Sequence, residues 1–256
     1  MVINNRDRQR TRVVFVPVNT GGGSQAKIKL GGSGIKLGSS TFTEVPQILD
    51  FSDVTDMSCM FESCYNLTTI PEIDTSNVTD MRYMFKFSYN LTNIPEIDTS
   101  NVTNMEGMFY YCQALTTVPK MNTSQVTNVI YMFYSCNLLT TIPPIDIPNV
   151  TDMYNMFYGC SSLTTIPEMN TPKVTGAYNA FGGCTSLTDL GGFIGIKADI
   201  DLSASSLITH DSLVNVITKA ADVTASPATL TLGSTNLAKL SDEEKGIATA
   251  KGWTLA

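Results

Sequence analysis

Apolar and polar positions in the middle of the chain follow a pattern that returns every 24 residues. Five periods contain a Met-Phe pair, a leucine and an Ile-Pro or Val-Pro pair in the same order, each with a Val-Thr pair, and a sixth has Ala180-Phe181 and no proline. The phenylalanine that marks the units recurs as Phe61, Phe85, Phe109, Phe133, Phe157 and Phe181. A unit of this size cannot bury an apolar face alone, so the period predicts stacked units that form one another's core.

Inside a unit, the spacing predicts one short helix and one short strand. Val78, Met81 and Phe85 lie three and four positions apart, which is one face of a helix, and Thr79 fits its N-cap. The segment LTNIP at 91–95 has the composition of a strand, and the polar residues after its proline predict a turn. Stacking such units predicts a parallel ladder with a rung about every 4.8 Å.

The repeated residues resemble a known family. The consensus L-T-x-I-P-x-I-D-T-S-x-V-T-D-M-x-x-M-F-x-x-C covers about 51–190, and it resembles the leucine-rich repeats of BspA-type and mycoplasma-type bacterial surface proteins. This resemblance implies an α/β leucine-rich-repeat solenoid, with binding or adhesion roles and no catalysis. We therefore assign 41–190 to a solenoid of about six 24-residue units, 191–256 to divergent repeats and a cap, and 1–40 to a basic N-terminal arm.

The C-terminal segment continues the architecture with a different pattern. Three strands separated by helices are expected, with cores at Ile200–Leu202, Leu230–Leu232 and Trp253–Leu255. Ser241 with Glu244 three residues later predicts a capping box, and Gly252 fits the end of that helix. The segment 196–256 resembles the C-terminal module of repeat proteins from gut bacteria and their tailed phages.

The N-terminal arm differs from the rest in charge. Residues 1–40 hold seven lysines and arginines against one aspartate, a net charge of +6. Because the whole chain carries −7, residues 41–256 carry −13. Four arginines precede a strand-like run, and the residues expected to anchor the arm are Arg6, Arg8, Arg10, Arg12, Val13, Val14, Phe15 and Val16. No neighbouring segment fits as a partner, so we expect Val13–Val18 to add as a strand to another chain, with the arginines facing acidic groups. A solvated basic tail is the alternative.

After the glycine-rich linker NTGGGSQ comes a small tandem, IKLGGSG and IKLGSS. Short strands or extended chain fit it. A phosphate-binding loop does not, because no helical pattern follows.

Residue types that carry chemistry are few. The single histidine, His210, lies near Ser206 and Ser212, but serines and a histidine at a helix start are interpreted as caps and turn residues instead of a catalytic dyad. Five cysteines share one repeat position: Cys64, Cys112, Cys136, Cys160 and Cys184. Ser88 fills the same position in the second unit, which favours small core fillers over disulfides or zinc ligands.

A second column alternates between aspartate and asparagine: Asp74, Asp98, Asn122, Asp146 and Asn170. This alternation predicts turns closed by side chains, with calcium as a minor alternative. The chain is therefore expected to be no enzyme and to hold no cofactor or metal.

Positions where the repeats differ are the candidates for binding, since stacking already explains the shared ones. Three tyrosines follow the Met-Phe pair on consecutive rungs and three more lie close in sequence: Tyr110, Tyr134, Tyr158, Tyr111, Tyr131 and Tyr154. They predict an aromatic strip suited to a carbohydrate or a partner protein. The alternative is that the tyrosines only cover the side of the stack, with hydrated hydroxyls.

Two functional settings remain open. No apolar run is long enough to span a membrane, and the first residues do not form a signal peptide. We therefore expect a structural or binding protein of a tailed-phage virion, of fibre, decoration or receptor-binding type, assembled in the bacterial cytoplasm. Its arm would join other virion proteins, with protein favoured over nucleic acid as the partner and multimeric assembly left open. The alternative is a BspA-type adhesin on the bacterial cell surface that binds host protein or glycan.

Overall fold

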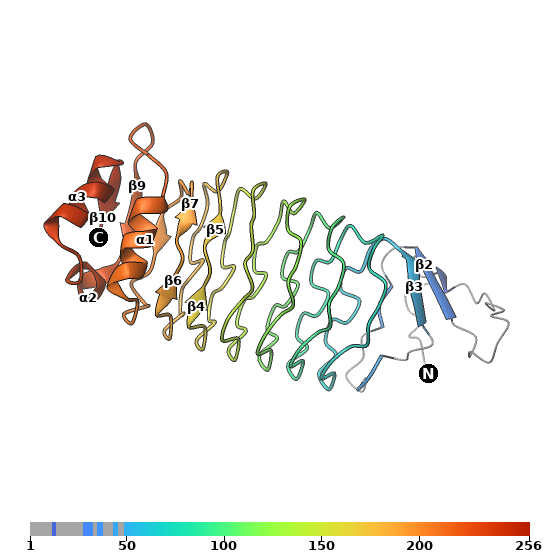
Figure 1. Ribbon diagram of the computed structural model, residues 1–256. Coiled ribbons are helices and arrows are strands. Elements are labelled where there is room, and N and C mark those ends of the chain that lie inside the picture. Colours follow the sequence, from blue (N-terminus) through green and yellow to red (C-terminus); the bar gives the residue numbers. More distant parts are fainter. Residues whose placement is uncertain (1–11, 14–27, 33–34, 38–42, 46–48) are drawn as a thin grey trace.

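The computed structural model describes residues 12–13, 28–32, 35–37, 43–45 and 49–256. Residues 49–256 form one elongated stack of coils that ends in a helical C-terminal part (Figure 1). The 24-residue period of the sequence is the rise from one coil to the next. Phe61 N–H donates to the carbonyl of Met84 at 2.8 Å, and Thr79 N–H donates to the carbonyl of Thr55 at 2.9 Å.

The predicted helix in each unit is wrong, because the segment forms a chain of tight turns. Alternate backbone N–H groups serve different partners: Met84 N–H donates within the turn to Met81, and Phe85 N–H donates to Met108 of the next coil. Tyr83 and Phe87 adopt left-handed conformations, with φ of 53° and 62°. An α-helix needs every interior N–H for its own carbonyls and right-handed residues throughout, so it cannot form here.

Side chains close the start of each turn. The expected N-cap, Thr79, instead donates its hydroxyl to the carbonyl of Thr55, 24 residues earlier, at 3.2 Å. One residue later, Asp80 Oδ1 accepts from the N–H of Arg82 at 2.9 Å. Aspartate and asparagine at this position therefore fold the chain into the turn by bonding their own backbone two residues on.

Parallel pairing between units is present, but its regular strands are short. β4 (Thr165–Ile166) pairs with β6 (Asp189–Leu190), and β5 (Met169–Asn170) pairs with β7 (Phe193–Ile194), both in parallel. The segment 91–95 is not a strand, contrary to the prediction.

The coils without regular strands are joined by a ladder of threonines. In each step of this ladder, the hydroxyl donates to the carbonyl of the threonine 24 residues earlier, as Thr92 does to Thr68 at 3.0 Å. The same contact recurs at Thr116, Thr140, Thr164 and Thr188. The threonine that follows the leucine in each unit therefore forms a hydrogen-bonded column along the stack.

The N-terminal strands correct one prediction. β1 (Arg12–Val13) pairs antiparallel with β2 (Ile28–Gly32), which pairs in parallel with β3 (Leu49–Val54). Val13 lies opposite Leu30, so the described part of the strand-like run has a partner in its own chain. β2 also supports the prediction of short strands in the IKLGGSG tandem. The other anchor candidates lie outside the described residues: Arg6, Arg8, Arg10, Val14, Phe15 and Val16.

The C-terminal part has the predicted alternation of strands and helices. Its strands, β8 (Ile200–Asp201), β9 (Ala228–Thr231) and β10 (Trp253–Leu255), form a parallel sheet in the order β10-β9-β8. Its helices are α1 (His210–Lys219), α2 (Gly233–Leu237) and α3 (Asp242–Ala250). Ser241 and Glu244 form the predicted capping box, and Gly252 has φ of 84° just after α3.

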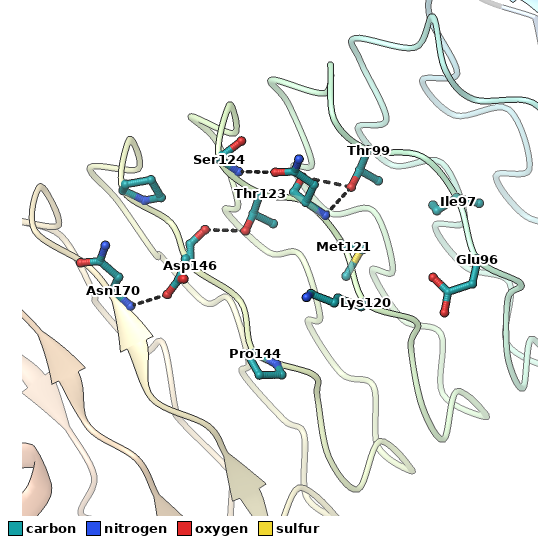
Figure 2. Close-up of a pocket in the computed structure, with 12 residues that line it drawn as sticks. Glu96, Ile97, Thr99, Lys120, Met121, Thr123, Ser124, Pro144, Asp146 and Asn170 are labelled. Atoms are coloured by element: carbon teal, nitrogen blue, oxygen red, sulfur yellow. Dashed lines mark hydrogen bonds between the residues drawn. The ribbon is translucent and has the colours of Figure 1, made fainter.

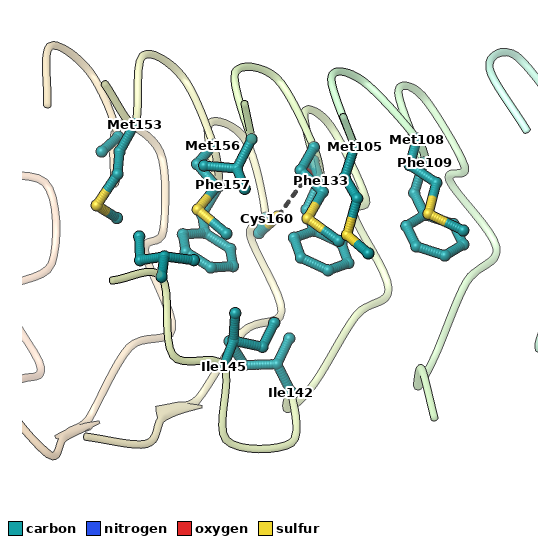
Figure 3. Close-up of a cluster of buried hydrophobic side chains, with 14 of the residues drawn as sticks. Met105, Met108, Phe109, Phe133, Ile142, Ile145, Met153, Met156, Phe157 and Cys160 are labelled. Atoms are coloured by element: carbon teal, nitrogen blue, oxygen red, sulfur yellow. Dashed lines mark hydrogen bonds between the residues drawn. The ribbon is translucent and has the colours of Figure 1, made fainter. Parts of the chain in front are cut away.

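The core runs along the inside of the stack (Figure 3). The Met-Phe columns are buried as predicted, and every phenylalanine of the column is at most 1% exposed. Neighbouring rings stack with centroids 5.4 to 5.8 Å apart and interplanar angles of 5 to 14°. Each coil thus contributes one ring to a continuous pile, and methionine and isoleucine side chains fill the space around it.

Candidate functional site

The six predicted tyrosines lie together on the outside of the turns. Tyr110 stacks on Tyr134 with ring centroids 4.8 Å apart, and Tyr134 stacks on Tyr158 at 5.0 Å. Tyr111 meets Tyr110 edge to face at 4.9 Å. Tyr131 meets Tyr134 at 5.7 Å. The variable position after the Met-Phe pair therefore builds a stacked row of three rings, as its period predicts.

The contacts extend beyond the predicted set. Tyr154 joins through Tyr131 at 5.3 Å and then stacks on Tyr178 at 5.7 Å. Five further rings complete one connected cluster, which we call the aromatic surface: Tyr65, Tyr83, Phe87, Tyr89 and Tyr178. These five stand at neighbouring variable positions of the repeat, so comparing every variable column would have revealed them.

Local backbone geometry makes room for these rings. Gly107 has φ of 53°, and a Cβ there would lie 2.2 Å from Cε1 of Tyr83. The Tyr83 ring therefore covers Gly107, and only glycine fits beneath it. Gly182 plays a similar part under Tyr158, since a Cβ there would lie 2.8 Å from the ring.

The stacking determines which part of each ring is exposed to solvent. Tyr110 and Tyr134 are half-buried, and their faces pack on neighbouring rings with interplanar angles of 14 to 17°. Such rings present edges and hydroxyl groups instead of open faces. The chemistry of the middle of the aromatic surface is therefore that of polar, partly positive ring edges.

Electrostatics keep the phenols protonated. The Tyr83 hydroxyl donates to Glu106 Oε1 at 2.5 Å, and the amide of Asn128 donates to Glu106 Oε2 at 3.2 Å. Burial raises the pKa of Tyr83 well above its usual value, and the hydrogen bond to Glu106 adds to this shift. Burial also raises the pKa of Tyr110 and of Tyr134. The hydroxyls therefore remain neutral donors and acceptors.

The N-terminal end of the aromatic surface carries charge. Lys86 Nζ lies 4.9 Å from the Tyr83 ring centroid and 5.0 Å from that of Phe87, and it pairs with Glu62 at 3.3 Å. Towards the C-terminal end, the segments 154–167 and 174–188 contain no charged residue. Asp152 nevertheless brings a carboxylate to this end, since its Oδ1 accepts from the N–H of Tyr154 at 2.8 Å and would lie 2.9 Å from a Cβ on Gly176.

The cysteine column lies in the core. Cys112, Cys136, Cys160 and Cys184 are buried free thiols, and each donates to the carbonyl of a phenylalanine 27 residues earlier at 3.1 to 3.2 Å. Ser88 makes the same bond to Phe61 at 2.9 Å. Burial raises the pKa of the Cys184 thiol to about 12. These contacts agree with the interpretation of small core fillers.

His210 contacts carboxylates, not serines. Its Nε2 lies 2.8 Å from Glu244 Oε1, and its Nδ1 lies 3.1 Å from Asp211 Oδ1. The hydroxyl of Ser212 bonds instead to Thr209, at the cap of α1. The N-cap of α1 is Thr209, whose side chain accepts from the N–H of Ser212, so the cap is a neighbour of the residues singled out in the sequence, and the contacts described here do not pair His210 with a serine.

A shallow depression crosses the turns that follow the prolines (Figure 2). It holds about 740 Å³, and its lining includes Glu96, Lys120, Pro144 and Asp146. The predicted side-chain turns are present at Asp74, Asp98 and Asn122, each accepting from the backbone two residues on. Asp146 departs from the pattern and accepts from the N–H of Asn170 at 3.1 Å.

No helix among the described residues is both long and apolar enough to cross a membrane. In the same part of the chain, no group of three or more histidine, cysteine, aspartate or glutamate side chains could hold a metal ion.

The stacked coils and the aromatic surface define a repeat protein that presents an extended lateral surface. The chain belongs to the family described as Mycoplasma protein of unknown function, DUF285, whose sequence model matches residues 38–142 and 87–193. The resemblance to mycoplasma-type repeats is therefore confirmed. No curated protein matches the sequence.

A solved structure with low identity is also similar to this chain. It is a leucine-rich repeat protein from Bacteroides ovatus ATCC 8483, 13% identical, with a TM-score of 0.28. The match covers 83% of this chain and 65% of the length of that protein.

Proposed function

We propose that this chain is a non-enzymatic binding protein and that the middle of its aromatic surface contacts a partner protein. The observation that carries the proposal is the connected row of tyrosines across successive coils, with Tyr110 and Tyr134 at its centre. Tyrosine is enriched at the centres of protein interfaces, where it contributes large contact area and a hydroxyl at low entropic cost.

The exposed parts of these rings support a protein partner over a sugar. A sugar packs on an open ring face, but Tyr110 and Tyr134 use their faces on each other and on Tyr158. Ring edges and hydroxyls remain, and these suit backbone carbonyls and carboxylates of a protein. The leucine-rich-repeat solenoid inferred from sequence would hold these groups in a fixed spacing.

Site-specific photo-crosslinking tests this proposal. A benzophenone amino acid replaces Tyr158, which is 36% exposed, and the matched control replaces Leu207, which is 57% exposed and lies in the C-terminal part. We expect position 158 to crosslink one defined protein in the particle or on the cell that carries the chain, and position 207 to crosslink none. No crosslink at 158 in that assembly would refute the contact.

The setting that we propose is a tailed-phage virion, in which the N-terminal arm joins the chain to other virion proteins. The resemblance of 196–256 to modules of gut bacteria and their phages supports it. A BspA-type adhesin on the bacterial surface, bound to host protein or glycan, is the second candidate, supported by the family of the repeats. Mass spectrometry of purified phage particles separates the two, since only the first requires the polypeptide in the particle.

Truncation tests the arm. Because β2 (Ile28–Gly32) lies within the predicted arm 1–40 and pairs with β3, the first truncation ends before β2. Removing 1–27 keeps β2 and should leave the fold and the circular dichroism spectrum unchanged while incorporation into the assembly is lost. Removing 1–40 also deletes Leu30 and Ile35, each 1% exposed, and should cost about 3 kcal/mol or more of stability. Full incorporation of the first truncation would show that the arm is not the anchor.

A further inference from the structure

Tyrosine is confined to one surface of this chain. All ten tyrosines belong to the aromatic surface. The other easily oxidised side chains lie inside the stack: each described methionine, like Trp253, is at most 3% exposed, and the cysteine column is buried. Cys59, outside that column, is half-buried. Because susceptibility to oxidation follows exposure, an oxidant in solution meets phenol rings before most of the sulfur.

Two of these tyrosines form an exposed pair on the first two coils. Tyr65 stacks on Tyr89 with ring centroids 5.4 Å apart and an interplanar angle of 10°. Tyr65 is 39% exposed and Tyr89 is 38% exposed. In the other stacked tyrosine pairs of the described residues, at least one ring is half-buried: Tyr110–Tyr134, Tyr134–Tyr158 and Tyr154–Tyr178. The pair on the first two coils therefore presents both of its phenols to solvent.

Backbone contacts hold this pair in register. Asn90 Nδ2 donates to the carbonyl of Tyr65 at 2.7 Å, and the N–H of Ala114 donates to the carbonyl of Tyr89 at 3.0 Å. Later coils fill the same repeat position with small or polar residues: Gln113, Asn137, Ser161 and Thr185. Stacking of the coils therefore does not require an aromatic ring there, and the repeat alone does not account for the pair.

We infer that Tyr65 and Tyr89 are a modification site, at which oxidation joins the first two coils through a dityrosine bond. The oxidant is hydrogen peroxide acting through a haem peroxidase, which takes one hydrogen atom from each phenol while the peroxide is reduced to two molecules of water. Each phenoxyl radical carries part of its unpaired electron on the ring carbons beside the oxygen. One such carbon of each ring forms the new carbon–carbon bond, and the hydrogens of these two carbons move to the oxygens and restore both phenols.

The bond would act as a staple near the N-terminal end of the repeats. It links residues 24 positions apart, and a covalent link across such a loop stabilises a fold by restricting the unfolded chain. Coils near the end of a stack have fewer neighbours to hold them, so they open more readily than the middle. The staple is therefore placed where the stack gains most from it. The inference does not depend on the partner proposed for Tyr110 and Tyr134.

Exposure alone would favour a different product. Tyr178 is 68% exposed, but its stacking partner Tyr154 is half-buried. A radical on Tyr178 therefore meets a second oxidised ring most readily on another molecule. Coupling that is directed by exposure gives covalent dimers, whereas coupling directed by the stacked pair stays within one chain.

Treatment of the dilute full chain with peroxidase and hydrogen peroxide tests the site. Trypsin cuts after lysine and arginine, so Tyr65 and Tyr89 fall in different peptides, 37–82 and 87–120. We expect the monomeric protein to yield these two peptides joined, with a mass two hydrogen atoms below their sum and with dityrosine fluorescence. Fragmentation should place the bond at Tyr89 and not at Tyr110 or Tyr111 of the second peptide.

Tyr65→Phe is the matched control, because phenylalanine keeps the stacked ring and has no phenol to oxidise. This variant and Tyr89→Phe should each abolish the joined peptides, whereas Tyr178→Phe should leave their yield unchanged. After treatment, the urea midpoint should rise by about 0.5–1 M more in the unsubstituted chain than in Tyr65→Phe. Equal midpoint changes would overturn the staple.

Three results would overturn the modification site itself. These are the absence of the joined peptides, their presence in covalent dimers alone, and their persistence in Tyr65→Phe. None of these results bears on crosslinking at position 158, which tests the proposed partner contact separately.

Discussion

Replacing Phe133 by alanine tests how much of the stability lies in the phenylalanine column. Phe133 is fully buried and stacks on Phe109 and on Phe157, each at 5.5 Å. Truncating a buried phenylalanine to alanine costs about 3–5 kcal/mol. Each aromatic pair contributes about 0.5–1.5 kcal/mol beyond its buried area. With two such pairs lost, we expect a decrease in the free energy of unfolding near the top of that range, about 4–5 kcal/mol.

Urea unfolding followed by far-ultraviolet circular dichroism measures this loss. Phe61→Ala is the matched control, because Phe61 is equally buried but has one ring neighbour among the described residues, Phe85 at 5.4 Å. Its loss should be smaller by about 1 kcal/mol. A loss below about 1 kcal/mol for Phe133→Ala would contradict its place in the core. Equal losses for the two variants would show that ring stacking adds nothing to burial.

Three further outcomes follow from particular contacts. Reducing agent should leave the melting temperature unchanged, and Cys136→Ser should be tolerated; a drop of several degrees with reductant would instead reveal disulfides. Hydrogen bonds to Asp211 and Glu244 raise the pKa of His210. Its contribution to stability is therefore complete below about pH 6.5 and is lost as the pH rises through the raised value. His210→Gln should lower the urea midpoint at pH 5.5 but not at pH 8.5, and an equal effect at both would contradict this. Gly107→Ala should cost about 1–3 kcal/mol by urea unfolding, and a neutral result would show that the tyrosine above it yields.

The sequence predicts the period, the buried columns and the capped C-terminal part, because these depend on which residues repeat. It does not predict the turns. Val78, Met81 and Phe85 have helical spacing, but Tyr83 and Phe87 between and after them are left-handed. Nothing in tyrosine or phenylalanine marks that conformation, and the hydrogen bonds that hold it come from the next coil. The predicted helix does not form because hydrogen bonds between neighbouring coils use the backbone N–H groups that a helix would need.

The aromatic surface was predictable in position but not in orientation. A column such as Tyr110, Tyr134 and Tyr158 must bring rings to neighbouring rungs. Whether those rings show faces or edges depends on their side-chain rotamers and on glycines beneath them, such as Gly182. The pairing of Val13 with Leu30 likewise joins segments with no shared period, so no pattern in the sequence indicates it.

The threonine ladder makes neighbouring coils interchangeable. Thr92, Thr116 and Thr140 each meet the threonine 24 residues earlier through the same bond. Removing one whole period from the middle of the stack would therefore join partners that already match. A variant that lacks one 24-residue period should therefore still fold into the same stack, shorter by one coil. Each such change would add or remove one coil together with its buried interface, so the reach of the contact surface and the stability of the stack would change together.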